Sequence, residues 1–106
     1  MNEVKRKYGL LEPDLDHILS ILTENRKIQE VILFGSRAKG NNSPGSDIDI
    51  AIRGAGLKLD DIIEAKIAFD ELSLPYTLDL VIYDQIKDSA LVEHINRVGI
   101  LLFNRR

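Results

Sequence analysis

Apolar residues recur three or four positions apart in three stretches of this chain, which is the spacing of one buried helix face. These stretches predict helices over about 13–25, 60–72 and 88–99. Asp60 is a residue type that favours helix N-caps, so we expect it to begin the second helix. The polar positions between the apolar ones then form the solvent-facing sides of these helices.

Shorter apolar runs that end at turn residues predict four strands. They are Val31–Phe34, Asp47–Arg53, Thr77–Tyr83 and Ile100–Phe103, and a brief helical turn is expected over 36–40. The predicted order is helix, strand, strand, helix, strand, helix, strand. Such an order is typical of an α/β (α+β) domain with one small mixed sheet and helices packed against it. We expect a single domain spanning residues 1–106, because 106 residues suffice for one core.

Two of the predicted strands carry aspartates among their apolar residues. Asp47 and Asp49 are two positions apart at the start of the second strand, so their carboxylates point to the same face while the isoleucines beside them point to the other. Asp79 interrupts the third strand in the same way. A carboxylate in an apolar strand is costly unless it is paired or binds a metal.

These three aspartates together predict a metal site built from oxygen ligands. Such ligands favour Mg²⁺, with Mn²⁺ as the alternative, over zinc. Two ions about 3.5–4 Å apart can activate an attacking hydroxyl and stabilise a leaving pyrophosphate. In this interpretation Asp47 and Asp49 hold both ions, and Asp79 holds the catalytic ion and accepts the proton of the incoming hydroxyl.

A tight turn after the first strand supplies the candidate nucleotide-binding residues. Gly35 lets the backbone approach a triphosphate, and Ser36 offers a hydroxyl and an amide. Arg37 or Lys39 would neutralise phosphate charge. The turn is not a Walker P-loop, because no Gly-Lys-Ser/Thr follows it.

The composition excludes several other classes of protein. The net charge of −3 argues against broad nucleic-acid binding, and the absence of cysteine excludes disulfides and thiolate metal sites. No apolar run approaches the ~20 residues of a membrane helix, and the first residues do not form a signal peptide. We therefore expect a cytoplasmic protein without a membrane partner.

The glycine–serine turn and the paired aspartates together resemble the signature of a known superfamily. Gly35-Ser36, ten residues, and then Asp47-Ile48-Asp49 is similar to the pattern of DNA polymerase β-like nucleotidyltransferases. The fuller strings over 34–40 and 46–50 resemble its small prokaryotic branch, the minimal nucleotidyltransferases, and Asp79 matches the third carboxylate of that family by position. The segment from His94 to the apolar tail also looks like the end of those short chains. The resemblance covers about 29–103.

This resemblance implies more than the residues do. It implies a minimal polymerase-β-like palm that transfers AMP from ATP to a hydroxyl with two Mg²⁺ ions. Members of this branch are often paired with a helical HEPN-type protein in a toxin–antitoxin system. In such a hetero-oligomer of the type VII kind, the minimal nucleotidyltransferase is the antitoxin and modifies a tyrosine of the toxin.

Two alternatives to this function stay open at the level of sequence. The chain could be a small-molecule adenylyltransferase subunit that is completed by a separate substrate-binding chain. It could instead be a non-catalytic antitoxin that neutralises its partner by binding alone. The sequence names neither the nucleotide, the acceptor nor the oligomeric state, and ATP is an expectation from the resemblance.

Overall fold

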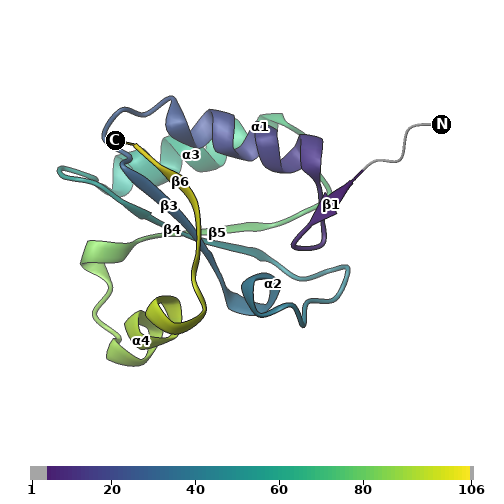
Figure 1. Ribbon diagram of the computed structural model, residues 1–106. Coiled ribbons are helices and arrows are strands. Elements are labelled where there is room, and N and C mark those ends of the chain that lie inside the picture. The colour runs from purple at the N-terminus through teal and green to yellow at the C-terminus, as the bar shows by residue number, and fades with distance from the viewer. Residues whose placement is uncertain (1–4, 106) are drawn as a thin grey trace.

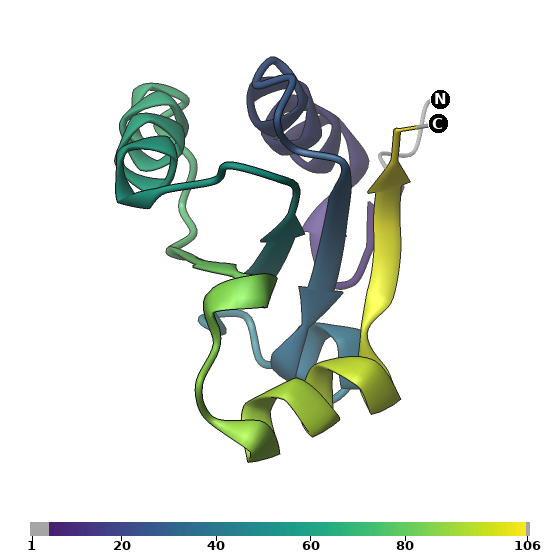
Figure 2. The same cartoon turned by 90° about the vertical axis from the view of Figure 1, so that its left-hand side faces the viewer.

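A four-stranded mixed sheet with the strand order β5-β4-β3-β6 forms the centre of the molecule (Figures 1 and 2). Its strands are β3 (Glu30–Phe34), β4 (Ile48–Arg53), β5 (Leu78–Ile82) and β6 (Ile100–Asn104). This computed structural model describes residues 5–105. The mixed sheet with helices packed on it confirms the fold class that the sequence predicts.

The pairing of the strands decides which residues meet on the sheet. β3 pairs antiparallel with both β4 and β6, whereas β4 pairs parallel with β5. In this register Asp49 lies between Phe34 on one side and Asp79 on the other. Two aspartates that are 30 positions apart in the sequence are therefore neighbours across adjacent strands.

Helices cover the two faces of the sheet unequally. α1 (Glu12–Thr23) and α3 (Leu59–Glu71) lie side by side on one face, and α4 (Ser89–Val98) lies on the other (Figures 1 and 2). The short helix α2 (Gly35–Lys39) follows β3 directly. We call the face under α1 and α3 the core face and the face under α4 the site face.

The alternation of β4 sends its side chains to these two faces as the sequence predicts. Ile48, Ile50 and Ile52 are fully buried on the core face, in the main hydrophobic cluster. Ala51 packs on the site face in a smaller cluster with Phe34 and Ile95. Most of the apolar burial therefore stabilises the core face, and the site face carries the polar residues.

The structure adds elements that the sequence pattern does not reveal. A hairpin of β1 (Arg6–Lys7) and β2 (Leu10–Leu11) precedes α1, and a 3-10 turn (Tyr83–Gln85) follows β5. Strands of two residues are too short for an alternating pattern to be recognised. Their place is fixed by contacts with distant parts of the chain.

One capping prediction is wrong. The N-cap of α3 is Lys58, not Asp60, and the helix begins at Leu59. The Asp61 carboxylate accepts a hydrogen bond from the Lys58 backbone N–H at 2.8 Å. Asp61 thus supplies the acceptor half of a capping box from inside the first turn.

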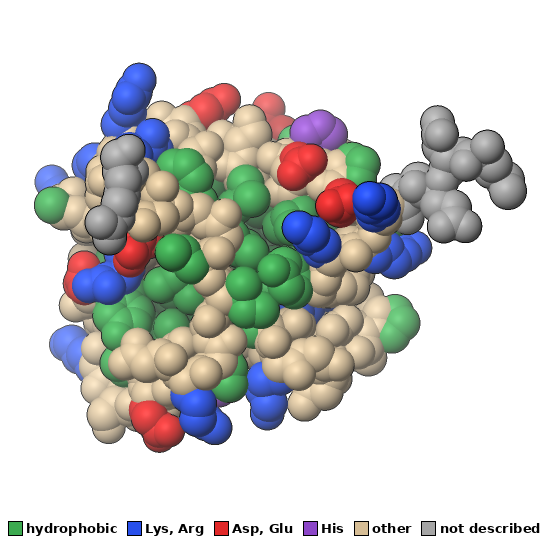
Figure 3. Space-filling model, viewed as in Figure 1, with side chains coloured by type: hydrophobic (Ala, Val, Ile, Leu, Met, Phe, Trp, Pro, Cys, Tyr) green, Lys and Arg blue, Asp and Glu red, His purple; other side chains and the backbone are tan. Residues whose placement is uncertain are grey.

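The outer strand β6 leaves apolar side chains at the surface. Figure 3 shows hydrophobic side chains gathered in the middle of the side of the molecule that faces the viewer, between α4 and the two helices above it. On this side β6 forms the edge of the sheet. Leu101 on β6 is 51% exposed. Among residues 5–105, no helix has the length and hydrophobicity that crossing a membrane requires.

Candidate active site

Asp49 and Asp79 form the centre of the candidate site. They occupy matching positions on the parallel pair β4 and β5, so both side chains lie on the site face. Asp79 is exposed at the outer strand, and Asp49 is half-buried next to it. Two carboxylates in this arrangement repel each other unless a proton or a cation lies between them.

The environment of Asp49 shows that repulsion. Burial, which is the largest cause, raises the pKa of Asp49 to about 6 together with the negative charges of Asp79 and Asp47 and a hydrogen bond to Asp79. The positive charge of Arg37 acts in the opposite direction. With such a pKa, Asp49 keeps its proton to a higher pH than an ordinary aspartate, and a divalent cation would replace that proton.

The paired carboxylates of Asp49 and Asp79, with Asp47 nearby, are suitable ligands for a divalent cation. Asp47 is exposed at the residue before β4, close enough for its charge to act on Asp49. Within the described part of the chain, no three acidic or histidine side chains already stand together as a metal cluster. Their oxygen-only chemistry suits Mg²⁺ or Mn²⁺. The assignment of Asp47, Asp49 and Asp79 as metal ligands stays a prediction.

Gly35 is required where it stands because its α-carbon faces the Asp49 carboxylate. A β-carbon at this position would collide with Asp49 Oδ2, and the backbone φ of +75° favours glycine. The turn therefore brings the backbone of Gly35 directly against the carboxylate pair. Ser36 follows as a half-buried residue in the first turn of α2.

Arg37 lies inside the protein. Its side chain is 1% exposed, and its guanidinium donates hydrogen bonds to the carbonyl oxygens of Tyr8 at 3.0 Å and Ser46 at 2.7 Å. It also lies over the Tyr76 ring at 5.5 Å. Arg37 thus connects the N-terminal hairpin to the residue before Asp47. In this position it supports the site from within and does not present its charge to solvent.

Lys39 has the opposite placement. It lies in the last turn of α2 and is exposed, so its ammonium group is free to approach an anion near the turn. Of the two cations that the sequence nominates for phosphate, Lys39 is therefore the accessible one.

His94 is a site residue that sequence reasoning missed. Its Nε2 accepts a hydrogen bond from the Gly35 backbone N–H at 3.1 Å, across 59 positions of sequence. Its ring meets Phe34 edge to face, with centroids 6.1 Å apart. The sequence offers no signal for this contact beyond a histidine on the last helix, because the partner is a backbone amide.

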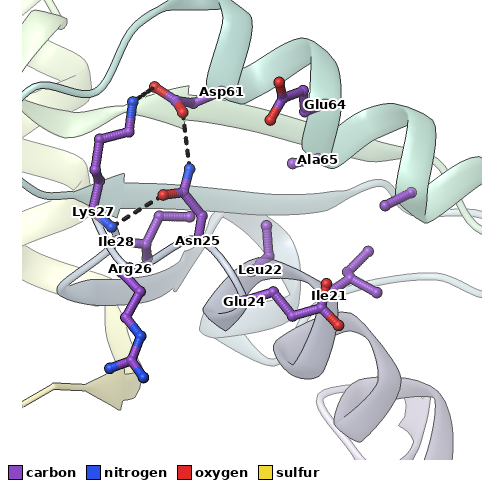
Figure 4. Close-up of a pocket in the computed structure, with 11 residues that line it drawn as sticks. Ile21, Leu22, Glu24, Asn25, Arg26, Lys27, Ile28, Asp61, Glu64 and Ala65 are labelled. Carbon is purple, nitrogen blue, oxygen red and sulfur yellow. Dashed lines mark hydrogen bonds and ion pairs between the residues drawn. The ribbon is translucent and has the colours of Figure 1, made fainter.

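A cavity lies away from the aspartates, on the side of α1 and α3. It has a volume of about 550 Å³ and opens between the end of α1, the following loop and α3 (Figure 4). Asp61 points into it and binds Lys27 Nζ at 2.8 Å and Asn25 Nδ2 at 2.9 Å. These bonds lower the pKa of Asp61. The network ties α3 to the loop after α1 and is a structural feature.

Comparison with known families identifies the class of protein. The family model described as polymerase beta, nucleotidyltransferase matches residues 16–106. The match covers most of the chain, including the turn and all three aspartates. The chain therefore belongs to the polymerase beta nucleotidyltransferase family.

Solved structures place it near one branch of that family. A chain of a toxin–antitoxin crystallised with AMP-PNP is 28% identical with a TM-score of 0.72, over 86% of this chain and 73% of that one. A chain from a complex of a tri-AMPylated Shewanella oneidensis HEPN toxin with an MNT antitoxin is 25% identical with a TM-score of 0.67, over 88% and 71%. A chain from an MntA–HepT toxin–antitoxin is 25% identical with a TM-score of 0.66, over 88% and 72%.

The fold thus matches that of antitoxin chains, among them MNT and MntA, that occur in toxin–antitoxin complexes. No protein of curated function matches this sequence significantly.

Proposed function

We propose that this protein transfers AMP from ATP to a hydroxyl group, and that the acceptor is a tyrosine of a HEPN-type toxin for which it is the antitoxin. The observation that carries the proposal is the Asp49–Asp79 pair beside the Gly35–Ser36 turn on the site face. The structural neighbours support it, since one contains AMP-PNP and another an AMPylated HEPN toxin.

In this proposal each residue has a distinct part. Ser36 binds the phosphates with its hydroxyl and amide, and Lys39 neutralises their charge from the surface. Asp47, Asp49 and Asp79 hold Mg²⁺. Bound Mg²⁺ would neutralise the triphosphate and the developing charge on the leaving pyrophosphate.

The transfer itself is a displacement at the α-phosphorus of ATP. The acceptor oxygen forms a bond to the α-phosphorus while the bond to the bridging oxygen of the β-phosphate breaks, and pyrophosphate leaves. Asp79 is exposed on the outer strand β5, where an incoming hydroxyl can reach it, and it accepts the proton of that hydroxyl. Asp49 lies deeper, where it would hold Mg²⁺ together with Asp47.

The proposed partner would bring the acceptor to this open site. The molecule presents apolar side chains that no described residue covers, with Leu59, Ile63 and Ile67 on one stripe of α3 at 68%, 46% and 56% exposure. Unpaired apolar surface of this kind is typical of proteins that assemble with another chain. It supports assembly with another chain, and we propose that this partner is helical and that the hetero-oligomer acts in the cytoplasm.

The test uses the protein with its partner from the source cell. Wild-type protein and the double variant Asp47→Ala/Asp49→Ala are incubated with Mg²⁺, α-phosphate-labelled ATP and lysate. The matched control is Asp16→Ala/Asp70→Ala, which removes the same charge from exposed helix positions. We expect wild type and control to label one protein, and the Asp47/Asp49 variant to lose the label.

The other outcomes identify the alternatives. Label found only on a small molecule would indicate a small-molecule adenylyltransferase. Neutralisation of the toxin by the Asp47/Asp49 variant at wild-type strength, with no label on any protein, would indicate an antitoxin that acts by binding. Either result would contradict the proposed function.

A further inference from the structure

The Gly35 backbone amide is already used inside the protein. Its N–H donates to His94 Nε2 at 3.1 Å, in a partly buried position between α2 and α4. A ring nitrogen that accepts a hydrogen bond carries no proton, so His94 is neutral with its proton on Nδ1. Phosphate contacts from this turn must therefore come from Ser36 and not from the Gly35 amide.

The hydrogen bond acts on the backbone unit that touches the carboxylates. Gly35 lies so close to Asp49 that no side chain fits between them, and its φ of +75° is held at a value that few residues adopt. A shift of this unit would move both the turn and the space around Asp49. The hydrogen bond to His94 ties this backbone unit to α4.

Helix α4 is well placed to hold the histidine. Ile95, the next residue, is 3% exposed and packs with Phe34 and Ala51 on the site face. The His94 ring in addition meets the Phe34 ring edge to face, at an interplanar angle of 80°. Phe34 is the last residue of β3 and the residue before Gly35, so the ring and the amide contacts fix consecutive residues.

We propose that His94 is a positioning residue for nucleotide binding, which holds the Gly35–Ser36 turn against Asp49 through its Nε2. The inference rests on the proposed function, because it assigns this turn to the triphosphate. It predicts that His94 touches neither ATP nor the molecule that receives AMP. It also predicts that the site requires the hydrogen-bond acceptor atom of His94, and not the size or charge of its side chain.

The test distinguishes the role of the hydrogen-bond acceptor atom of His94 from the role of its aromatic ring. His94→Phe keeps an aromatic ring against Phe34 and loses the acceptor, whereas His94→Gln restores a carbonyl acceptor on a side chain of similar reach. The matched control is His17→Phe, which changes the other histidine of the chain at an exposed position of α1. All four proteins are first compared by thermal unfolding.

The first readout is the affinity for ATP in the presence of Mg²⁺. A hydrogen bond of ordinary strength corresponds to a change of about 2- to 10-fold. We expect His94→Phe to weaken ATP binding by that factor, and His94→Gln and His17→Phe to bind within about 2-fold of wild type. In the transfer reaction the KM for ATP should rise while kcat stays near the wild-type value.

The second readout does not depend on nucleotide. In ¹⁵N NMR spectra of the free protein, His94 should show the Nδ1-protonated tautomer, and the Gly35 amide resonance should shift in His94→Phe and return toward wild type in His94→Gln. Unchanged ATP affinity in a folded His94→Phe variant, or the other tautomer, would overturn the inference. If wild type itself fails to bind ATP while the NMR result holds, the proposed function fails, and the positioning role fails with it.

Discussion

At the scale of the single residue, Asp49 is a predicted metal ligand whose burial and charged neighbours also affect the stability of the fold. Its carboxyl is half-buried beside Asp79, and burial together with the neighbouring charges raises its pKa to about 6. In the unfolded chain the same group titrates at its ordinary value of 3.8. Between these two values the folded protein binds a proton that the unfolded chain has lost.

This difference predicts that Asp49 lowers stability as the pH rises. Because the folded state holds the proton, the free energy of unfolding should fall between about pH 4 and pH 6 and then stay low. Asp49→Asn should therefore stabilise the protein above pH 6 by about 1 kcal/mol. This is less than the full shift implies, because water screens a partly exposed group. Urea unfolding across pH in EDTA measures the effect.

Two comparisons make that result specific. Asp16→Asn, at an exposed position of α1, should show no such gain. Added Mg²⁺ should reduce the difference in the free energy of unfolding between wild type and Asp49→Asn, because a cation stabilises the charged carboxylate of the folded wild type. A variant that is less stable than wild type at neutral pH would contradict the assigned repulsion.

At the scale of the element, α2 is a five-residue helix that starts with one glycine of left-handed backbone and is followed by another. Gly35 begins it with φ +75°, and Gly40 caps it with φ +81°. The two differ in their surroundings, since a β-carbon at Gly35 would collide with the Asp49 carboxylate, whereas one at Gly40 would meet nothing within 4 Å. Glycine at position 35 is therefore required both by the backbone conformation and by the contact with Asp49, whereas glycine at position 40 is required by the backbone conformation alone.

The matched pair Gly35→Ala and Gly40→Ala tests this division. Each should destabilise the protein by about 1–2 kcal/mol, because alanine is strained in the left-handed region. Only Gly35→Ala should also weaken Mg²⁺-dependent ATP binding, by about tenfold or ~1.4 kcal/mol, since Asp49 must rotate away from the methyl group. Isothermal titration and urea unfolding measure the two effects. An equal loss of affinity in both variants would show that strain, not the contact with Asp49, is responsible.

Elements and site differ in how far the sequence predicts them. The helices, the four main strands and the alternation around Asp49 follow from local spacing, so the pattern reveals them. The inward position of Arg37 does not, because its partners are the backbone carbonyls of Tyr8 and Ser46, which have no side-chain signature. The contact of His94 with the Gly35 amide is hidden for the same reason.

At the scale of the whole molecule, stability and chemistry are divided between the faces of the sheet. The core face buries the large hydrophobic cluster under α1 and α3. The site face has a small cluster under α4 together with Asp49 and Asp79. Among the helices of residues 5–105, α4 is the long one that contacts the turn of the candidate site, through His94.

This division predicts different consequences for the same substitution on the two faces. Ile18 on α1 and Ile95 on α4 are both buried, with 0% and 3% exposure, and changing either to alanine should cost about 2–5 kcal/mol of stability. Ile18→Ala should leave the ATP affinity of the folded molecules unchanged. Ile95→Ala should weaken it several-fold, because α4 can then shift and take the His94 acceptor away from Gly35.

The measurement must separate folding from binding, because such a loss is a large part of the ~5–15 kcal/mol that stabilises a typical domain. Urea unfolding gives the folded fraction of each variant, and titration with Mg²⁺ and ATP is then corrected by that fraction. Equal corrected affinities for the two variants would mean that the Gly35–Ser36 turn keeps its position without the packing of Ile95 on the site face. Loss of affinity confined to Ile95→Ala would mean that the small cluster on the site face holds the turn in position for nucleotide binding in addition to stabilising the fold.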